Sequence, residues 1–480
     1  MSFLAKKIYR FLYFWLKIIA FLFIVLVKKI IKMKLFKRKI YDRLINWKSN
    51  SDGRTALLIE GARRVGKTTV IKEFAKKEYR SFIFIDFDEE GKEIRRIFDS
   101  GFHDLNGLFR ALSLYYHTEL YPRNSLIVFD EVQRFPRIHE GRKYLVQDGR
   151  YDFIETGSLI TLKLLSTGFT NPSEVDHLLR YPLDFEEFLW AIGDSVTFPK
   201  IRESFSAKKP LGEVVNRQLM SLYRTYRCIG GMPQAIEQYC RDQINLSLVD
   251  KIKRNIVRLY TDDLKKYDLE YHSFTSSFYS HIPSFLSARN KLIKFSAIRK
   301  GGRYASLASS LDGIEKSMTG NICQNSSDPS IGLSLTAVPS DIKIYNSDTG
   351  LLISQVLSDN EITTDDIYKK LILNKLSINQ GRFFENSVSQ ALRASGHALY
   401  FHTFDSEQKK YEIDFLVQEK GKIIPIEVKS SSYNRHISLD LFLERNKGKK
   451  NIGQPIIIYT KDLKVENGIL YLPIYMTGLI

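Results

Sequence analysis

The segment Gly61–Thr68 (GARRVGKT) restricts the fold of this chain more than any other feature of its sequence. It matches the pattern GxxxxGK[ST] and follows Ala56–Glu60, an apolar run that predicts a buried strand. The residues after it, Val70–Lys77, predict a helix. Glycines at both ends let the backbone wrap around phosphates, whose charge is met by N–H groups and by the following helix N-terminus. This order predicts an α/β domain with a parallel sheet of the P-loop type.

Two polar side chains of this turn are candidate ligands of a bound nucleotide. Lys67 is expected to reach the β- and γ-phosphates, and the hydroxyl of Thr68 is expected to bind Mg²⁺. The sequence therefore predicts ATP and Mg²⁺ as cofactors. The residues of this segment expected to bind nucleotide are Gly61, Ala62, Arg63, Arg64, Val65, Gly66, Lys67, Thr68 and Thr69.

A second apolar run, Ser125–Phe129, predicts another buried strand, and two acids follow it directly. Asp130 is expected to hold Mg²⁺ through water, and Glu131 to orient and activate the attacking water. A solvated strand end is the alternative interpretation of such a pair. It fits less well here, because strands and helices alternate between the pair and the glycine-rich turn.

A third predicted strand, Tyr151–Glu155, is followed by the triplet TGS, which ends in Ser158. A polar side chain at this place can sense the γ-phosphate, and Ser158 is the candidate. The sequence leaves open a second interpretation, in which Ser158 is only the N-cap of a helix.

Several segments together resemble bacterial and archaeal AAA-superfamily ATPases that carry a C-terminal domain of unknown function. They are LLIEGARRVGKTT, IVFDEVQRFP, TGS and LLRYPLDFEEFL, continued by GGMPQAI, IVRLYTDDLKKY, IKIYNSDTGLL and GRFFENSVSQAL. The resemblance implies an AAA-like domain over residues 33–200, and a helical extension with a winged-helix region over residues 201–370. It further implies a restriction-endonuclease-like α/β domain over residues 371–480, and it leaves residues 1–32 unmatched.

Arg180 lies where the helical extension leaves the predicted ATPase core. Two interpretations remain open for it. In one, the guanidinium approaches the γ-phosphate, in cis or from a neighbouring subunit of a homo-oligomer. In the other, it forms an ion pair with Asp184 or Glu186.

The middle of the chain is helical in pattern over Leu211–Tyr267, with a break at residues 230–233. Two further helical stretches precede the short extended runs Gly332–Ala337 and Asp341–Tyr345. Helices followed by a small hairpin are typical of a winged helix-turn-helix, which puts a helix in the DNA major groove. A protein–protein or interdomain module is the alternative. The basic residues expected to meet phosphates are Arg289, Lys291, Lys294, Arg299, Lys300 and Arg303.

The stretch Tyr411–Ser430 predicts two strands around a tight turn at residues 419–422. If the turn is centred between residues 420 and 421, the numbers of facing residues sum to 841. Asp414 and Glu427 then face each other, with Cβ atoms ~4.5–5.5 Å apart. Lys429 points to the same side of the sheet, because strand side chains alternate.

Two carboxylates at that separation repel by ~3 kcal/mol at an effective dielectric of ~20, and a divalent cation removes this repulsion. Asp414 and Glu427 are therefore expected to bind Mg²⁺, and Lys429 to stabilise charge on a scissile phosphate. With Glu385 from the helical stretch Arg382–Leu392, the order of these residues is similar to the PD-(D/E)XK nuclease core. The alternative is a solvated strand face on which Lys429 neutralises the acids.

The net charge of +18 is concentrated at the N-terminus. Residues 1–39 contain eleven Lys or Arg and no acid, which leaves +7 for the other 441 residues. Within this part, Phe11–Val27 is apolar except for Lys17. Residues 8–31 together are just long enough for a bilayer span, which needs ~20 mostly apolar residues, and the larger positive charge after them predicts that the rest of the chain lies in the cytoplasm. The alternative is that Met33 is the functional start.

Three cysteines without a CxxC pair argue for a reducing compartment and against a zinc site. Two functions remain open. The first is an ATPase whose nucleotide state controls a DNA-acting, nuclease-like domain. The second is a nucleotide-gated regulatory or membrane-associated binding protein, in which the nuclease-like fold is catalytically silent.

Overall fold

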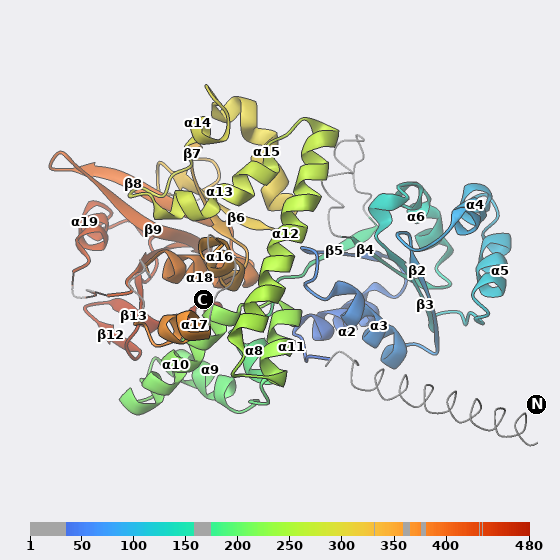
Figure 1. Ribbon diagram of the computed structural model, residues 1–480, viewed down its shortest axis with the longest axis horizontal. Coiled ribbons are helices and arrows are strands. Elements are labelled where there is room, and N and C mark those ends of the chain that lie inside the picture. The colour runs from blue at the N-terminus through green and yellow to red at the C-terminus, as the bar shows by residue number, and fades with distance from the viewer. Residues whose placement is uncertain are drawn as a thin grey trace, which may run out of the picture. The chain divides into compact units, whose positions relative to one another are not determined.

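A five-stranded parallel sheet forms the first part of the structure (Figure 1). The computed structural model describes residues 35–157, 174–330, 332–358, 365–375, 381–431, 433 and 435–480. The strand order is β2-β3-β4-β1-β5, so that β4 lies between β1 and β3. This is the α/β P-loop sheet that the sequence predicts. Its strands are β1 (Ala56–Glu60), β2 (Ser81–Asp86), β3 (Ser125–Asp130), β4 (Asp152–Gly157) and β5 (Val175–Leu179).

Helices cover both faces of this sheet, because its central strands are apolar on both sides. One face packs against α2 (Ile40–Ser51) and α3 (Lys67–Glu78) around Phe74. The other face packs around Phe129 and Phe153. Its covering elements are α4 (Lys92–Gly101), α5 (Leu105–Tyr115), η1 (Val132–Arg134) and α6 (Arg137–Asp148).

A helical region follows the first sheet, and its helix pattern breaks at Gly230 and Gly231, as the sequence predicts. Gly231 has a packing reason: a Cβ there would lie 2.2 Å from the carbonyl oxygen of Leu183. The helices before the break are α8 (Phe185–Ala191), α9 (Thr197–Ala207) and α10 (Glu213–Ile229). Those after it are α11 (Pro233–Arg241), α12 (Leu246–Tyr271), α13 (Thr275–Ser287), α14 (Phe295–Ile298), α15 (Tyr304–Lys316), α16 (Thr349–Val356) and α17 (Asp365–Ile372).

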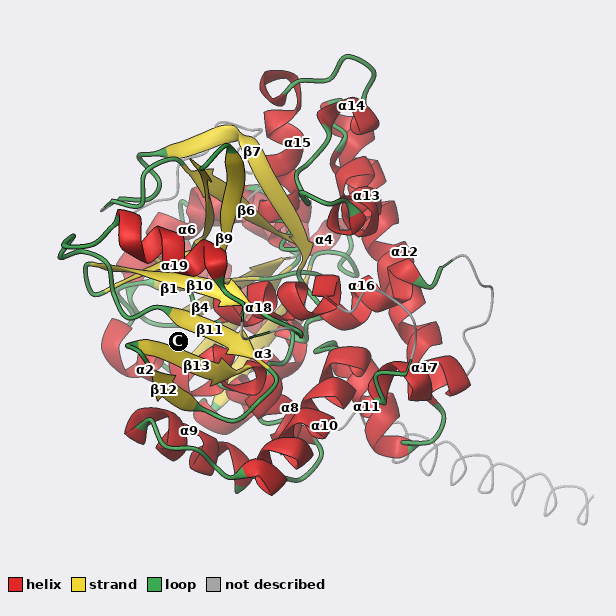
Figure 2. Cartoon of the chain, turned by 90° about the vertical axis from the view of Figure 1, so that its left-hand side faces the viewer, coloured by secondary structure: helices red, strands yellow, loops and turns green. Residues whose placement is uncertain are grey.

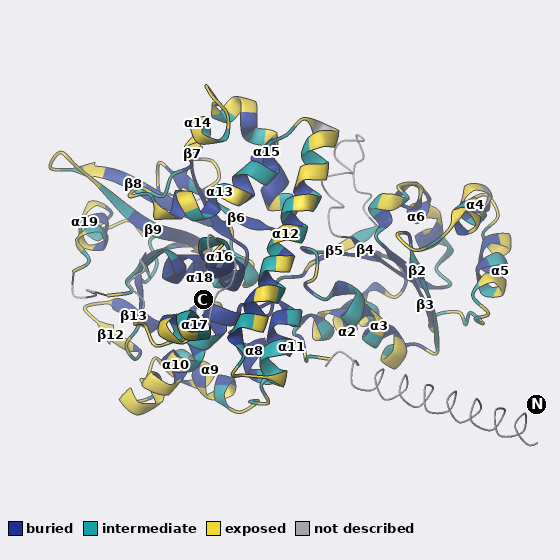
Figure 3. Cartoon of the chain, in the orientation of Figure 1, coloured by how far each residue is buried: buried dark blue, intermediate teal, exposed yellow. Residues whose placement is uncertain are grey.

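The second sheet is mixed and has eight strands in the order β12-β13-β11-β10-β9-β8-β6-β7. Its strands are β6 (Gly320–Ser326), β7 (Ala337–Asn346), β8 (Leu399–Ser406), β9 (Lys409–Glu419), β10 (Lys422–Val428), β11 (Ile456–Tyr459), β12 (Lys464–Glu466) and β13 (Ile469–Pro473). The elements α18 (Gly381–Ala394), α19 (Ile437–Arg445) and η2 (Ile474–Leu479) complete this part. Figure 3 shows buried residues along the strands of this sheet and along those of the first.

The hairpin in the middle of the chain corrects one sequence-based prediction. Gly332–Ala337, predicted as an extended run, is mostly a turn that leads into β7. Instead of forming a separate wing, β7 pairs with β6, beside which it lies in Figure 2. Because β6 also pairs with β8, both strands belong to the eight-stranded sheet. Pairing with β8 satisfies the backbone groups of β6 that a free hairpin would leave exposed. The predicted boundary at residues 370/371 therefore falls between strands of one sheet.

The membrane prediction concerns residues 8–31, which lie outside the described residues. Within the described part, no helix combines the length and the apolar character needed to cross a bilayer. From Lys37 to Ile480 the chain forms one compact unit.

Candidate functional site

The glycine-rich turn joins the end of β1 to the start of α3, which begins at Lys67, three residues before the predicted start. Gly66 adopts a left-handed conformation (φ 89°) that strongly favours glycine. At Gly61, a Cβ would lie 2.5 Å from the carbonyl oxygen of Arg180. Both glycines are therefore required by the geometry of the turn.

Lys67 is buried beneath this turn. Its Nζ donates to the carbonyl oxygens of Gly61 (2.7 Å) and Ala62 (3.2 Å). Burial lowers the pKa of Lys67 to about 8, partly opposed by the nearby Glu131 and Asp130. The side chain is thus a concentrated positive charge held in the turn by neutral carbonyls, which an incoming polyphosphate can replace.

Asp130 at the end of β3 faces the start of α3. It accepts a hydrogen bond of 2.8 Å from Thr68 Oγ1. Burial raises the pKa of Asp130 to about 6, and the neighbouring Glu131 adds to this rise. The structure thus brings Lys67, Thr68, Asp130 and Glu131 to one edge of the sheet. Ser158 lies outside the described residues.

Arg180 packs against the turn itself, and it does not pair with either acid considered for it. Its Nε donates to the carbonyl oxygen of Val65 (3.2 Å), while Asp184 and Glu186 pair with Lys39 at 2.6 and 2.7 Å. Burial lowers the pKa of Arg180 well below its usual range. Its Nη1 has no hydrogen-bond partner among the described residues. The turn therefore has a buried guanidinium beside it in cis.

Thr156 is a site residue that the sequence reasoning did not select. In the β3–β4 register Phe129 pairs with Glu155, so Asp130 and Thr156 are next to each other on adjacent strands. Both lie on the α3 side of the sheet, because Val128 and Ile154, two residues earlier, belong to the α3 core. Thr156 is fully buried, and its Oγ1 has no partner among the described residues. One signal could have found Thr156. It is a hydroxyl residue near the end of β4, and β4 lies between β1 and β3, the strands that lead into the two motifs.

We expect Thr156→Val to lower the rate of ATP hydrolysis by up to about tenfold, because a hydrogen bond contributes ~0.5–1.5 kcal/mol and ~1.4 kcal/mol corresponds to a factor of ten. Stability should be unchanged or slightly higher, because the substitution removes an unpaired buried hydroxyl. Thr156→Ser keeps the hydroxyl and is the matched control, with activity near that of the wild type. Steady-state hydrolysis and thermal melting of both variants check this. Equal activity of the valine variant would contradict a role at the nucleotide.

The turn is also tied to the long helix α12. Arg63 Nη1 lies 3.0 and 2.9 Å from the two carboxylate oxygens of Asp263. The hydroxyl of Tyr260, one helical turn earlier, donates to the carbonyl oxygen of Arg63 (2.8 Å). Both the side chain and the backbone of a P-loop residue are therefore bound by α12.

The predicted register of the C-terminal hairpin is confirmed. The pairs run from Lys422 with Glu419 to Ile426 with Phe415, and their numbers sum to 841. Extended by one residue beyond the last ladder pair, the same sum would set Asp414 opposite Glu427. We refer to Glu385, Asp414 and Glu427 as the carboxylate cluster.

Of the two acids of the hairpin, Glu427 is buried and Asp414 is half-buried. Asp414 Oδ2 accepts from the backbone N–H of Val428 (2.8 Å), and Lys429 Nζ donates to Glu427 Oε1 (2.7 Å). Glu427 Oε2 is buried and has no partner among the described residues. Burial raises the pKa of Asp414 to about 8, and the charges of Glu427 and Glu385 contribute to this rise.

Both carboxylate oxygens of Glu385, which lies on α18, accept hydrogen bonds. Oε1 accepts from the hydroxyl of Tyr345 (2.5 Å), and Oε2 accepts from Nζ of Lys291. Burial alone would raise the pKa of Glu385, but Lys291 and Lys343 outweigh it and lower that pKa. Lys291, predicted to face DNA phosphates, thus contacts the cluster instead.

Lys343 of β7 is fully buried beside the cluster. Its Nζ lies 2.5 Å from Glu412 Oε1 and 3.8 Å from Glu385 Oε1. Sequence reasoning missed Lys343 and Tyr345, because β7 reaches the cluster only through the order of strands in the eight-stranded sheet.

The hairpin acids fit a Mg²⁺ ion. Mg²⁺ is commonly held by one or two carboxylates together with substrate phosphates and water. Asp414 and Glu427 supply two carboxylates, and the unpartnered Glu427 Oε2 leaves an oxygen for a cation. Across the described residues, no group of three or more His, Cys, Asp or Glu side chains could hold a metal.

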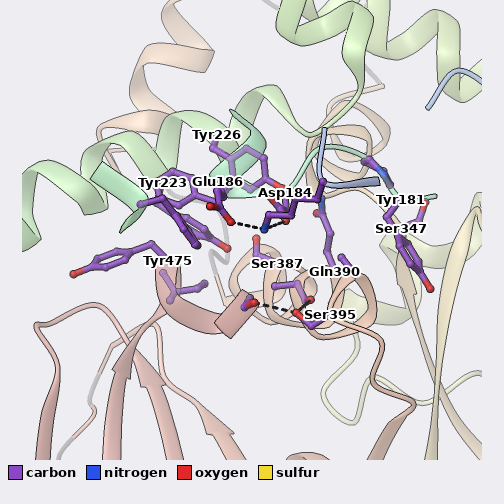
Figure 4. Close-up of a pocket in the computed structure, with 18 of the residues that line it drawn as sticks. Tyr181, Asp184, Glu186, Tyr223, Tyr226, Ser347, Ser387, Gln390, Ser395 and Tyr475 are labelled. Atoms are coloured by element: carbon purple, nitrogen blue, oxygen red, sulfur yellow. Dashed lines mark hydrogen bonds and ion pairs between the residues drawn. The ribbon is translucent and has the colours of Figure 1, made fainter. Parts of the chain in front are cut away.

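A cavity of ≈ 40 Å³ lies between α8, α10, α18 and η2 (Figure 4). The hydroxyl of Tyr226 donates to the carbonyl oxygen of Leu183 (2.8 Å) and accepts from Gln390 Nε2 (3.2 Å). The volume suits no more than one or two water molecules. We regard this cavity as part of the packing between these helices, since no nucleotide fits it.

Three protein-family models match separate parts of the chain. Residues 53–189 match the AAA domain family. Residues 220–361 and 380–476 match two families described as domains of unknown function, DUF8612 and DUF4143. The first match spans the five-stranded sheet, and the third contains the whole carboxylate cluster.

The chain is also similar to whole proteins. It is 25% identical over 454 residues to the uncharacterized protein MJ1544 of Methanocaldococcus jannaschii, covering 90% of this chain and 86% of that protein. Among solved structures, the Walker-type ATPase PABY2304 of Pyrococcus abyssi has a TM-score of 0.38 and 16% identity, covering 68% of this chain and 97% of that one. PCH-2 of C. elegans has a TM-score of 0.26 and 12% identity, covering 44% and 63%. Both TM-scores are low, so the assignment rests on the family match and the P-loop geometry. Residues 53–189 are an AAA-type ATP-binding domain.

Proposed function

We propose that this chain is a Mg²⁺-dependent ATPase whose nucleotide state controls a DNA-acting, nuclease-like C-terminal domain. The observation that carries the proposal is the double attachment of Arg63 to α12, through Asp263 and Tyr260. A turn that rearranges around phosphates must move these bonds or break them. The glycine-rich turn and the helical region are therefore mechanically connected.

In the ATPase site, each side chain has a defined task. Lys67 exchanges its two carbonyl acceptors for phosphate oxygens. Thr68 and Asp130 would hold Mg²⁺, which neutralises phosphate charge when bound. Glu131, next to Asp130, orients the attacking water and accepts its proton.

The helix α12 continues this connection toward the second sheet. Lys253, fully buried on α12, donates to the carbonyl oxygens of Cys228 (2.6 Å) and Gly350 (3.2 Å). These carbonyls belong to α10 and α16. The ring of Tyr260 also packs against Tyr279 of α13, with centroids 6.0 Å apart. A displacement of α12 at the P-loop would thus be transmitted to α10, α13 and α16.

At the C-terminal site, Asp414 and Glu427 would hold Mg²⁺, Glu385 is the further acid, and Lys429 would stabilise charge on a scissile phosphate. The basic side chains between α13 and α15, apart from Lys291, are exposed and available to DNA phosphates. They are Arg289, Lys294, Arg299, Lys300 and Arg303.

Incubation of the full chain with supercoiled plasmid, Mg²⁺ and ATP tests this function. We expect strand breaks that require ATP and are lost in Lys429→Ala. Binding without strand breaks across several metals would refute nuclease activity and support the alternative function. That alternative, a nucleotide-gated binding protein with a silent nuclease-like fold, is favoured by one observation: Lys291 and Tyr345 occupy both oxygens of Glu385.

Asp263→Asn should weaken the control of the C-terminal domain by ATP while leaving ATP hydrolysis nearly unchanged. The variant loses the charge that holds Arg63, so ATP hydrolysis should stay within about threefold of the wild type. The ATP-dependent change in plasmid binding or cleavage should fall at least about tenfold, because a charge-assisted contact is worth ~1.5–3 kcal/mol. Asp262→Asn, an exposed neighbour on the same helix, is the control. Full nucleotide control in the Asp263 variant would contradict the role of α12.

A further inference from the structure

Lys291 reaches the carboxylate cluster from outside the strands and helix that carry the acids. It lies in the connection between α13 and α14, and its Nζ donates to Glu385 Oε2. Glu385 is 3% exposed, whereas the side chain of Lys291 keeps 26% of its surface exposed. A partly solvated ammonium therefore neutralises a fully buried carboxylate.

A second feature of the cluster is a buried carboxylate oxygen without a hydrogen-bond partner in the part of the chain that the structure describes. Glu427 is 4% exposed, and Lys429 contacts only its Oε1. Its Oε2 is buried without a hydrogen-bond partner among the described residues. The hairpin register, extended by one residue, would set Glu427 opposite Asp414, whose Oδ2 accepts from the backbone N–H of Val428. Within the described chain, one carboxylate oxygen of the cluster thus lacks a hydrogen-bond donor, while another accepts from Lys291.

We propose that Lys291 is a displaceable counter-ion of the carboxylate cluster, which a divalent cation replaces. The cation binds Asp414 and Glu427, and its charge takes the place of the Lys291 ammonium, which moves into solvent. The inference deepens the proposed function and rests on it, because it takes the cluster to be a metal site.

Three lysines lie near the carboxylate cluster, and their surroundings favour Lys291 as the one that a cation displaces. Lys343 is fully buried and is held by Glu412, so it has no path to solvent. Lys429 is two residues from Glu427 and stays beside that acid. Lys291 precedes Leu292 and Ile293, which are pinned to β7 by a β-bridge and by a 2.9 Å backbone hydrogen bond to Ile342. Exchange therefore requires rotation of the Lys291 side chain and no opening of the loop.

Calorimetric titration of the nucleotide-free full chain with Mn²⁺ and with Mg²⁺ tests this inference. Lys291→Met removes the competing charge at similar length, and we expect at least about tenfold tighter cation binding. Lys291→Arg retains the charge and should bind within about threefold of the wild type. Lys291→Gln is a second uncharged variant, and Lys294→Met is the control at a neighbouring exposed lysine. Thermal melting verifies that each variant is folded.

Adding Asp414→Asn to the methionine variant assigns the site, because cation binding that survives in this double variant belongs to the ATPase domain. Binding by Lys291→Met that equals or is weaker than that of the wild type would overturn the counter-ion role alone. If neither chain binds a cation in a manner that depends on Asp414, the metal site of the proposed function fails as well. The two failures are thus distinguishable.

Discussion

Lys67→Ala is expected to abolish ATP turnover, with a loss of at least about 100-fold in kcat/KM. A hydrogen bond to a charged group contributes ~1.5–3 kcal/mol, and removing a donor that stabilises developing charge costs ~2.7–4 kcal/mol. Lys67 supplies both contributions at once, because its ammonium is buried and aimed at the carbonyls that phosphates would replace. Hydrolysis assays and nucleotide titration measure the loss.

Lys76→Ala is the matched control, because Lys76 is an exposed lysine on the same helix. It should leave both hydrolysis and affinity unchanged. Unaltered hydrolysis by the Lys67 variant would refute the assignment of the phosphate site.

The pH dependence of nucleotide binding follows from the same buried amine. The pKa of Lys67 is lowered to about 8, so above this pH the amine is increasingly neutral in the nucleotide-free protein. A bound polyphosphate favours the ammonium form, so binding above that pH must take up a proton. ATP affinity should therefore fall as pH rises through about 8, and Lys67→Ala should lose this dependence. Titration of both chains between pH 7 and about 9.5 measures it.

The local parts of the fold could be predicted from the sequence. Ala56–Glu60 is the observed β1, and the observed β3 exceeds its predicted run by the single residue Asp130. The hairpin register was predictable because Gly421 adopts a left-handed conformation, φ 74°, which fixes the turn and therefore every pair that follows. In each case residues close in sequence determine the geometry.

What the sequence could not predict depends on contacts between distant segments. Lys291 and Glu385 are 94 residues apart, and neither periodicity nor charge pattern indicates that they meet. The pair β6–β7 has the spacing of an isolated wing, and only its pairing with β8 assigns it to the large sheet. Arg63 was predicted as a phosphate-binding residue, but its partner Asp263 is 200 residues away. Both the control of the ATPase and the neutralisation of the cluster arise from this long-range packing.

Asp414→Asn is expected to raise the free energy of unfolding by about 2 kcal/mol or more at pH 8 without divalent cations. The pKa of Asp414 is about 8 in the folded chain, against ~3.9 in an unfolded one. The folded state therefore holds its proton more tightly, so this carboxyl lowers stability progressively as pH rises from about 4 to about 8. Asparagine removes this dependence and can still accept from the N–H of Val428.

Denaturant unfolding across pH 5 to about 9 measures the effect, with Asp405→Asn on the exposed side of β8 as the control. The wild type should lose stability over this range relative to the Asp414 variant, and the control should follow the wild type. Added Mg²⁺ should stabilise the wild type and not the variant, because a ligand that binds only the folded state shifts the equilibrium toward it. Parallel pH profiles for the wild type and Asp414→Asn would show that Asp414 is ionised in the folded chain without a metal. In that case the lysines around the cluster, rather than a bound proton or cation, would balance its charge.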